Sequence, residues 1–185
     1  MSLARLSGAV LACAAAVAVA TGCAGTREEG EPLREGLGVE VGGLKYNVFI
    51  TRQINARNAS DRGFYQGPEP APGFTHYGVF IKVCNEAKKG FRTPVEHFVV
   101  KDSQGNEFEP LELEEDNVFA YRARRLSPEA CVPEAGSPPA TGPTGGALLL
   151  FEFPVATLEN RPLELEIEDP EPGGGLDKGA IELDL

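Results

Sequence analysis

The sequence predicts an all-β protein, an immunoglobulin-like antiparallel β-sandwich that follows an N-terminal signal peptide and a short tether. From Leu37 onward, apolar and polar residues alternate with a period of two, which is typical of strands with one buried face and one solvated face. Segments rich in glycine and proline separate these runs, and no segment after the signal peptide has the period of an amphipathic helix. Short strands without helices pack most simply as two sheets, and a closed barrel is the alternative architecture.

The first predicted strands lie close together in the chain. Gly38–Val41 and Leu44–Ile50 are joined by a turn at Gly42 and Gly43. Alternation in the second of them predicts one buried face made of Leu44, Tyr46, Val48 and Ile50. A third strand, Tyr77–Val83, alternates in the same way and is expected to bury Tyr77, Val79, Ile81 and Val83.

The remaining predicted strands occupy the second half of the chain: His97–Lys101, Glu107–Leu113, Val118–Arg122, Leu148–Phe153, Leu163–Glu168 and Ile181–Leu185. Asp102–Asn106 is the predicted turn between the first two of these. The segment Pro138–Gly146 is a predicted loop, because its prolines and glycines suit neither a strand nor a helix.

The N-terminus has the features of an export signal. In residues 1–22, Arg5 precedes an uncharged apolar run, Val10–Ala20, which is short for a membrane span and ends in small residues. Residues 20–23, Ala-Thr-Gly-Cys, resemble a bacterial lipobox, in which the cysteine is lipidated and becomes the mature N-terminus. We therefore expect a lipid on Cys23 and a location at the extracytoplasmic face of the cell membrane. Ordinary signal-peptidase cleavage after Ala20, which would give a secreted protein, is the alternative.

This assignment divides the chain into three parts. Residues 1–22 form the lipoprotein signal peptide, and residues 23–36 form the lipidated cysteine and a flexible tether, which is polar and without periodicity. Residues 37–185 form the β-sandwich domain.

The four cysteines fit the same assignment. Cys13 leaves with the signal peptide and Cys23 carries the lipid, so that Cys84 and Cys131 remain as a pair in an oxidising compartment. A disulfide between them is expected, and two buried free thiols are the alternative. Since Cys84 follows the inward-facing Val83, the bond should lie on the outer face of a sheet and fix a loop there, unlike the inter-sheet bridge of antibody domains.

Four segments together resemble the DUF4352 family of bacterial exported lipoproteins. They are Leu37–Val48, the strand Tyr77–Glu86 with its terminal asparagine, the strand–turn–strand His97–Phe108, and the late strand Leu149–Val155. The resemblance covers nearly all of residues 37–185 and implies an immunoglobulin-like sandwich related to small secreted mycobacterial antigens. It implies no catalytic residues, because the family has no established activity.

Composition and motifs exclude several classes of function. The chain has 17 basic and 28 acidic side chains and a formal net charge of −11, so nucleic acid is not an expected partner. His76 and His97 lie on different segments without a third histidine, so neither a metal site nor another cofactor is expected. The sequence contains no G-x-S-x-G, Ser-x-x-Lys or CxxC motif. We therefore expect a protein that is not an enzyme.

Several surface segments are candidates for binding. Four aromatic residues flank a stiff loop rich in glycine and proline at residues 66–73 and form a candidate binding loop: Phe64, Tyr65, Phe74 and Tyr77. Covering one end of the sandwich is their alternative role. A second candidate is the loop Ser137–Gly146. The basic cluster Tyr121–Arg125 is interpreted as a strand end with exposed arginines, although it would also suit an acidic partner or lipid headgroups. The acidic segment Glu112–Asn117 is interpreted as a solvated turn, and calcium binding there stays open.

The sequence thus predicts a membrane-anchored, extracytoplasmic, non-catalytic binding module whose partner is an envelope protein or another extracellular ligand. The alternative is a secreted or surface metal-dependent hydrolase. That alternative requires His76, His97 and an acid in one pocket, whereas well-separated histidines favour the binding module.

Overall fold

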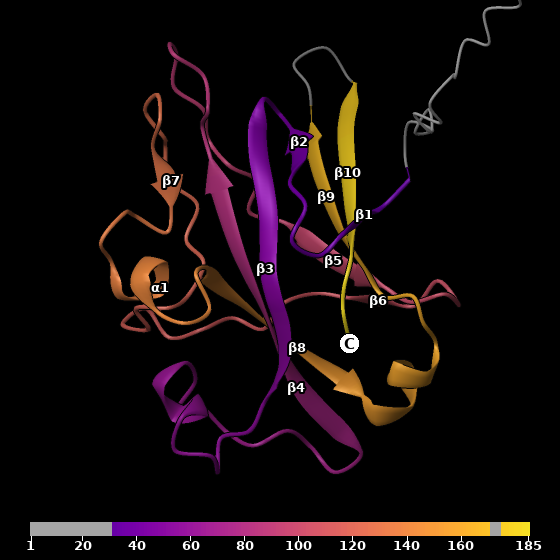
Figure 1. Cartoon of the computed structure of the whole chain (residues 1–185). Coiled ribbons are helices and arrows are strands. Elements are labelled where there is room, and N and C mark those ends of the chain that lie inside the picture. The colour runs from indigo at the N-terminus through magenta and orange to yellow at the C-terminus, as the bar shows by residue number, and fades with distance from the viewer. Residues whose placement is uncertain (1–30, 171–174) are drawn as a thin grey trace, which may run out of the picture.

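Two β-sheets pack against each other in the computed structural model, which describes residues 31–170 and 175–185 (Figure 1). The predicted signal peptide, residues 1–22, and the predicted lipidation site, Cys23, lie outside the described residues. In the described part of the chain the strands are β1 (Leu33–Arg34), β2 (Val39–Val41), β3 (Leu44–Ile54), β4 (Phe74–Cys84), β5 (Phe98–Lys101), β6 (Glu107–Phe108), β7 (Cys131–Val132), β8 (Ala147–Pro154), β9 (Glu164–Pro170) and β10 (Leu176–Glu182). The predicted all-β sandwich is confirmed.

The first sheet has the order β1-β10-β9-β5-β6. Its pairs are antiparallel except β1, which runs parallel to β10 with Leu33 opposite Ile181. The carboxylate of Glu35 then accepts hydrogen bonds from the backbone N–H of Thr51 at 2.8 Å and of Asp184 at 3.1 Å. The predicted tether, residues 23–36, is therefore wrong at its C-terminal end, because Leu33 and Arg34 belong to the sandwich.

The second sheet has the order β2-β3-β4-β7, and β8 also pairs with β4. The long strand β4 pairs with β3 along one edge; along the other it pairs first with β8 and then, at Val83 and Cys84, with β7. A β-bulge between Val48 and Ile50 changes the alternation of β3. The prediction that Ile50 is buried is therefore wrong, because Ile50 is exposed and Thr51 is buried in its place.

The main core lies between the sheets and contains the predicted inward faces of β3, β4 and β9, including Tyr46, Val48, Ile81, Val83 and Leu165. A second cluster lies on the other face of β4 and β8, where Phe80, Leu148 and Leu150 pack against loop residues. Both faces of β8 are thus buried along Ala147–Phe151, which explains why these five residues are all apolar.

The predicted strand Ile181–Leu185 shares only Ile181 and Glu182 with β10, and three other predicted elements also differ from the structure. The strand predicted at Glu107–Leu113 ends at Phe108, and Leu111 makes only an isolated bridge to Leu150. Val118–Arg122 forms no strand, although Ala120 makes a bridge to Leu148. The predicted loop Pro138–Gly146 begins with one helical turn, α1 (Pro138–Thr141), where proline occupies the first turn and loses no hydrogen bond.

Two 3-10 turns, η1 (Asp61–Gly63) and η2 (Val155–Glu159), complete the described elements. In residues 31–170 and 175–185, no helix has the length and apolar character needed to cross a membrane.

Candidate functional site

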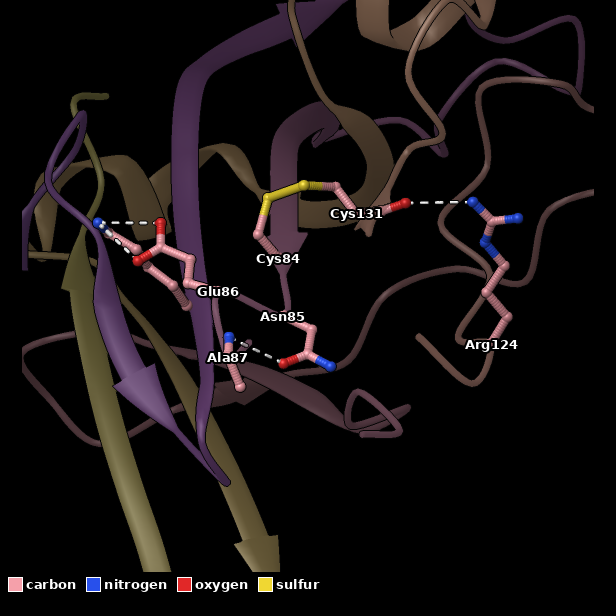
Figure 2. Close-up of a disulfide and its surroundings, with 7 residues drawn as sticks. Cys84, Asn85, Glu86, Ala87, Arg124 and Cys131 are labelled. Carbon is pink, nitrogen blue, oxygen red and sulfur yellow. Dashed lines mark hydrogen bonds and ion pairs between the residues drawn. A yellow bond between two sulfur atoms is a disulfide. The ribbon is translucent and has the colours of Figure 1, made fainter. Parts of the chain in front are cut away.

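A disulfide between Cys84 and Cys131 joins β4 to the edge strand β7, as predicted (Figure 2). The two residues are a direct cross-strand pair with Cα atoms 4.1 Å apart, and both are half-buried. Their neighbours Val83 and Val132 face the main core. The bond therefore lies within one sheet, on its outer side, and is not a bridge between sheets.

Asn85, directly after the disulfide, joins the two loops on either side of the bond. Its side chain is fully buried; Nδ2 donates to the carbonyls of Gly90 at 3.0 Å and Leu126 at 3.3 Å, and Oδ1 accepts from the N–H of Ala87 at 3.2 Å. Its backbone N–H also donates to the carbonyl of Ala130. Loop 85–92 and loop 126–131 are therefore held as one rigid surface.

A hollow of about 700 Å³ opens beside the disulfide. Segments that are distant in the sequence line it, namely β4 at Lys82, loop 85–92 at Phe91, the chain from Arg124 to Gly136, and α1 at Ala140. The predicted candidate loop Ser137–Gly146 thus contributes α1 to this wall. Figure 1 shows β7 and α1 on the side of the molecule opposite β1 and β10.

Positive charge gathers around this hollow. Arg124 donates from Nη1 to the carboxylate of Glu134 at 3.1 Å. It also donates from Nη2 to the carbonyl of Cys131 at 3.1 Å (Figure 2). The guanidinium of Arg125 lies over the Phe91 ring at 4.3 Å, and this ring is 54% exposed. Glu129 also lines the hollow. The exposed Lys88, Lys89 and Arg92 follow on the neighbouring loop. We call the hollow and its lining residues, together with these three neighbouring cations, the basic hollow.

The four aromatic residues predicted as a binding loop do not gather into one exposed surface. Phe64 and Tyr65 are 8% and 9% exposed and belong to the second core cluster. Tyr77 is half-buried and packs against the main core, and only Phe74 is exposed. Their alternative role, covering one end of the sandwich, describes Phe64 and Tyr65 better.

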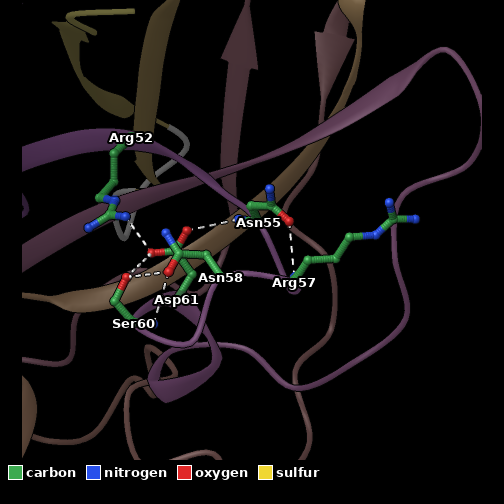
Figure 3. A network of polar contacts seen from close by, with 6 residues as sticks. All are labelled: Arg52, Asn55, Arg57, Asn58, Ser60 and Asp61. Carbon is green, nitrogen blue, oxygen red and sulfur yellow. Dashed lines mark hydrogen bonds and ion pairs between the residues drawn. The ribbon is translucent and has the colours of Figure 1, made fainter.

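Asp61 explains why Phe64 turns inward. Its buried carboxylate accepts hydrogen bonds from Arg52 and from the backbone N–H of Asn55, so the loop folds back onto β3 (Figure 3). Arg52 also lies 5.9 Å from the centre of the Phe64 ring. A short acidic residue within a polar loop gives no sequence signal for this contact.

The two histidines have separate surroundings. His76 on β4 is buried and lies 3.2 Å from the carboxylate of Glu152 on β8, whereas His97 is exposed and lies 3.4 Å from Glu109. Among the described residues, no group of three or more histidine, cysteine, aspartate or glutamate side chains is arranged to hold a metal ion.

Part of the acidic segment Glu112–Asn117, namely Leu113, Glu114, Asp116 and Asn117, lines a smaller hollow of about 340 Å³ together with residues 63–67. Asn117 donates to the carbonyl of Phe64 at 2.9 Å, and Arg122 donates to the carbonyls of Leu113 and Glu114, both at 2.9 Å. These hydrogen bonds hold the acidic segment against Phe64 and Arg122. Its observed role is therefore structural.

Comparison with known proteins supports the fold. Neither a protein-family profile nor a curated protein sequence matches this chain. Among solved structures, the chain is similar to the yjhA protein from Bacillus subtilis, with a TM-score of 0.53 and 11% identity over 82% of this chain and 99% of that one. An uncharacterized beta-sandwich protein from Clostridium difficile 630 has a TM-score of 0.45 and 9% identity over 85% of this chain and 98% of that one.

Proposed function

We propose that this chain is a membrane-anchored extracytoplasmic lipoprotein and that its sandwich is a non-catalytic binding module of the cell envelope. The observation that carries the proposal is the Cys84–Cys131 disulfide, since such bonds form and persist in oxidising compartments outside the cytosol. The export signal and the lipobox-like cysteine, Cys23, agree with that location. The resemblance of residues 37–185 to DUF4352 lipoproteins supports the same proposal.

The binding surface that we propose is the basic hollow. Recognition surfaces on sandwiches are commonly loops held by a rigid scaffold. Here the disulfide and the buried Asn85 hold the loops that surround the hollow. A volume of about 700 Å³ also falls in the range that is usual for ligand sites. The partner is then an envelope component or another extracellular ligand.

Cell fractionation tests the anchor. We expect the natural chain in the membrane fraction and the Cys23→Ala variant in the medium or the soluble envelope fraction, because the variant has no thiol to carry the lipid. Cys13→Ala is the matched control, since Cys13 lies inside the signal peptide and its loss should leave the protein in the membrane. A Cys23→Ala variant that stays in the membrane fraction, or a natural chain found in the cytosol, would contradict the proposal.

A further inference from the structure

We propose that the basic hollow binds an oxyanion, a carboxylate or a phosphate, carried by a ligand with an apolar body. The inference rests on the proposed binding function and names the ligand class of the same site. The chain as a whole is strongly acidic, with a formal net charge of −11, so a surface that gathers cations differs from the rest of the molecule.

Lys82 is the first cation of the site. It lies on the outer side of β4, next to the disulfide, and is half-buried while it lines the hollow. Within residues 31–170 and 175–185 it has no ion-pair or hydrogen-bond partner, whereas Lys45, on the neighbouring strand β3, pairs with Glu86 at 3.3 Å. A partly desolvated ammonium without a carboxylate gains more from an incoming anion than a fully solvated one.

Arg125 is the second cation, and its position is fixed by packing. Its guanidinium stacks on the exposed ring of Phe91 at 4.3 Å, and in the described part of the chain no carboxylate pairs with it. Stacking uses the face of the guanidinium and leaves its N–H edge available to a carboxylate or phosphate. The apolar body of the ligand would contact Phe91, Pro133 and Ala140, which line the same hollow.

Arg124 and Glu134 show how an oxyanion fits this surface. The Glu134 carboxylate already binds the Arg124 guanidinium at 3.1 Å on the wall of the hollow. This is an exposed ion pair, which contributes little free energy and is replaced easily. Glu134 and Glu129 also place negative charge at the hollow, so removal of Glu134 should strengthen anion binding.

The test is calorimetric titration of the full-length chain carrying Cys23→Ala, with inorganic phosphate, phenyl phosphate and benzoate as probes. We expect the two aromatic probes to bind more tightly than inorganic phosphate. Lys82→Ala and Arg125→Ala should each weaken binding roughly tenfold or more, since each removes one charge-assisted hydrogen bond. Glu134→Gln should strengthen binding several-fold.

Arg62→Ala is the matched control, because Arg62 is an exposed arginine at η1, away from the hollow, and should leave the affinity unchanged. Lys82→Gln repeats the test with a side chain of similar length, and thermal unfolding confirms that each variant is folded. The proposal is overturned if none of the probes binds, if Lys82 and Arg125 variants bind as well as the parent, or if Arg62→Ala weakens binding equally.

A second arm distinguishes a free ligand from a lipid headgroup. Cosedimentation with phosphatidylglycerol vesicles that is lost with Lys82→Ala, and is absent with phosphatidylcholine vesicles, identifies a lipid phosphate as the source of the oxyanion. Binding of phenyl phosphate without cosedimentation identifies a soluble ligand. Both results support the oxyanion site, and neither depends on the anchor at Cys23. Cell fractionation can therefore contradict the lipid anchor without affecting the oxyanion site, and titration can contradict the oxyanion site without affecting the anchor.

Discussion

His76 is a histidine with one satisfied ring nitrogen and one unsatisfied ring nitrogen. Only 2% of the residue is exposed; Nε2 lies 3.2 Å from the carboxylate of Glu152, and Nδ1 is buried without a hydrogen-bond partner in the described structure. Tyr65 packs edge-on against the ring at 5.3 Å. The neutral tautomer with a proton on Nε2 fits this environment, because protonated Nδ1 would face no acceptor.

This environment makes stability depend on pH. Burial lowers the pKa of His76 below its ordinary value of 6.5, although Glu152 acts in the opposite direction. The unfolded chain then binds a proton that the folded chain does not, so the free energy of unfolding should fall as the pH drops below about 6.5. Urea unfolding of the natural chain and of His76→Gln between about pH 5 and pH 8 measures the effect, and the variant should lose this part of the slope.

His97→Gln is the control for that experiment. The His97 side chain is 69% exposed, so His97→Gln makes the same substitution at a histidine outside the core. Unfolding curves that respond to pH equally in the natural chain and in His76→Gln would contradict the role assigned to His76.

β4 is the element on which both the core and the site depend. It pairs with β3, β7 and β8, places Val79 and Ile81 in the main core, and presents Lys82 and Cys84 to the outer side. The strand β7 has only two residues, so the disulfide contributes much of the connection between β4 and the loop that follows Arg124.

Removal of the disulfide should therefore be costly. The bond closes a loop with a sequence separation of 47, and the loop-entropy relation gives a stabilisation of about 4 kcal/mol. We expect the double variant Cys84→Ala with Cys131→Ala to lose roughly this much free energy of unfolding in urea titrations. The natural chain treated with a reductant should lose a similar amount. A loss below about 1 kcal/mol in both samples would show that the sheet holds β7 without the bond.

Strand periodicity predicted the strands that have one apolar face and one polar face. It was wrong at the bulge in β3 and at Val118–Arg122. β9 alternates because Leu165 and Ile167 face the core while its glutamates face water. The bulge in β3 inverts the pattern after Val48, and nothing local in the sequence marks it. Val118–Arg122 alternates like a strand, yet it makes only an isolated parallel bridge along the edge of β8, where Leu148 exchanges backbone hydrogen bonds with Phe119 and Tyr121.

At the scale of the whole molecule, the candidate site is a product of tertiary structure. The cluster of arginines at 122–125 stands out in the sequence, but Lys82 and Phe91 come from other segments. The pairing of β4 with β7, the disulfide, the antiparallel bridge between Arg92 and Leu126, and the hydrogen bonds of Asn85 bring them together. The four aromatic residues of the candidate binding loop do not share one exposed surface, because Asp61 holds Phe64 and its loop against the sandwich.

Acidic and basic side chains are distributed unevenly over the surface of the molecule. Glu164, Glu166 and Glu168 line the solvated face of β9, where Lys101 and Lys178 pair with two of them. Lys82 and Arg125, which have no acidic partner among the described residues, lie instead beside the disulfide. We therefore expect the domain to repel anionic surfaces over most of its exterior and, as proposed above, to accept an anion at the basic hollow.

We have proposed that the protein is anchored by a lipid on Cys23 and carries a disulfide between Cys84 and Cys131. Measuring the intact mass of the mature protein purified from membranes tests both features at once. We expect a chain that begins at Cys23, carries the mass of a lipid, and lacks two hydrogen atoms because Cys84 and Cys131 are joined. A chain that begins at Thr21 without added lipid mass, or one in which alkylation before reduction labels Cys84 and Cys131, would contradict it.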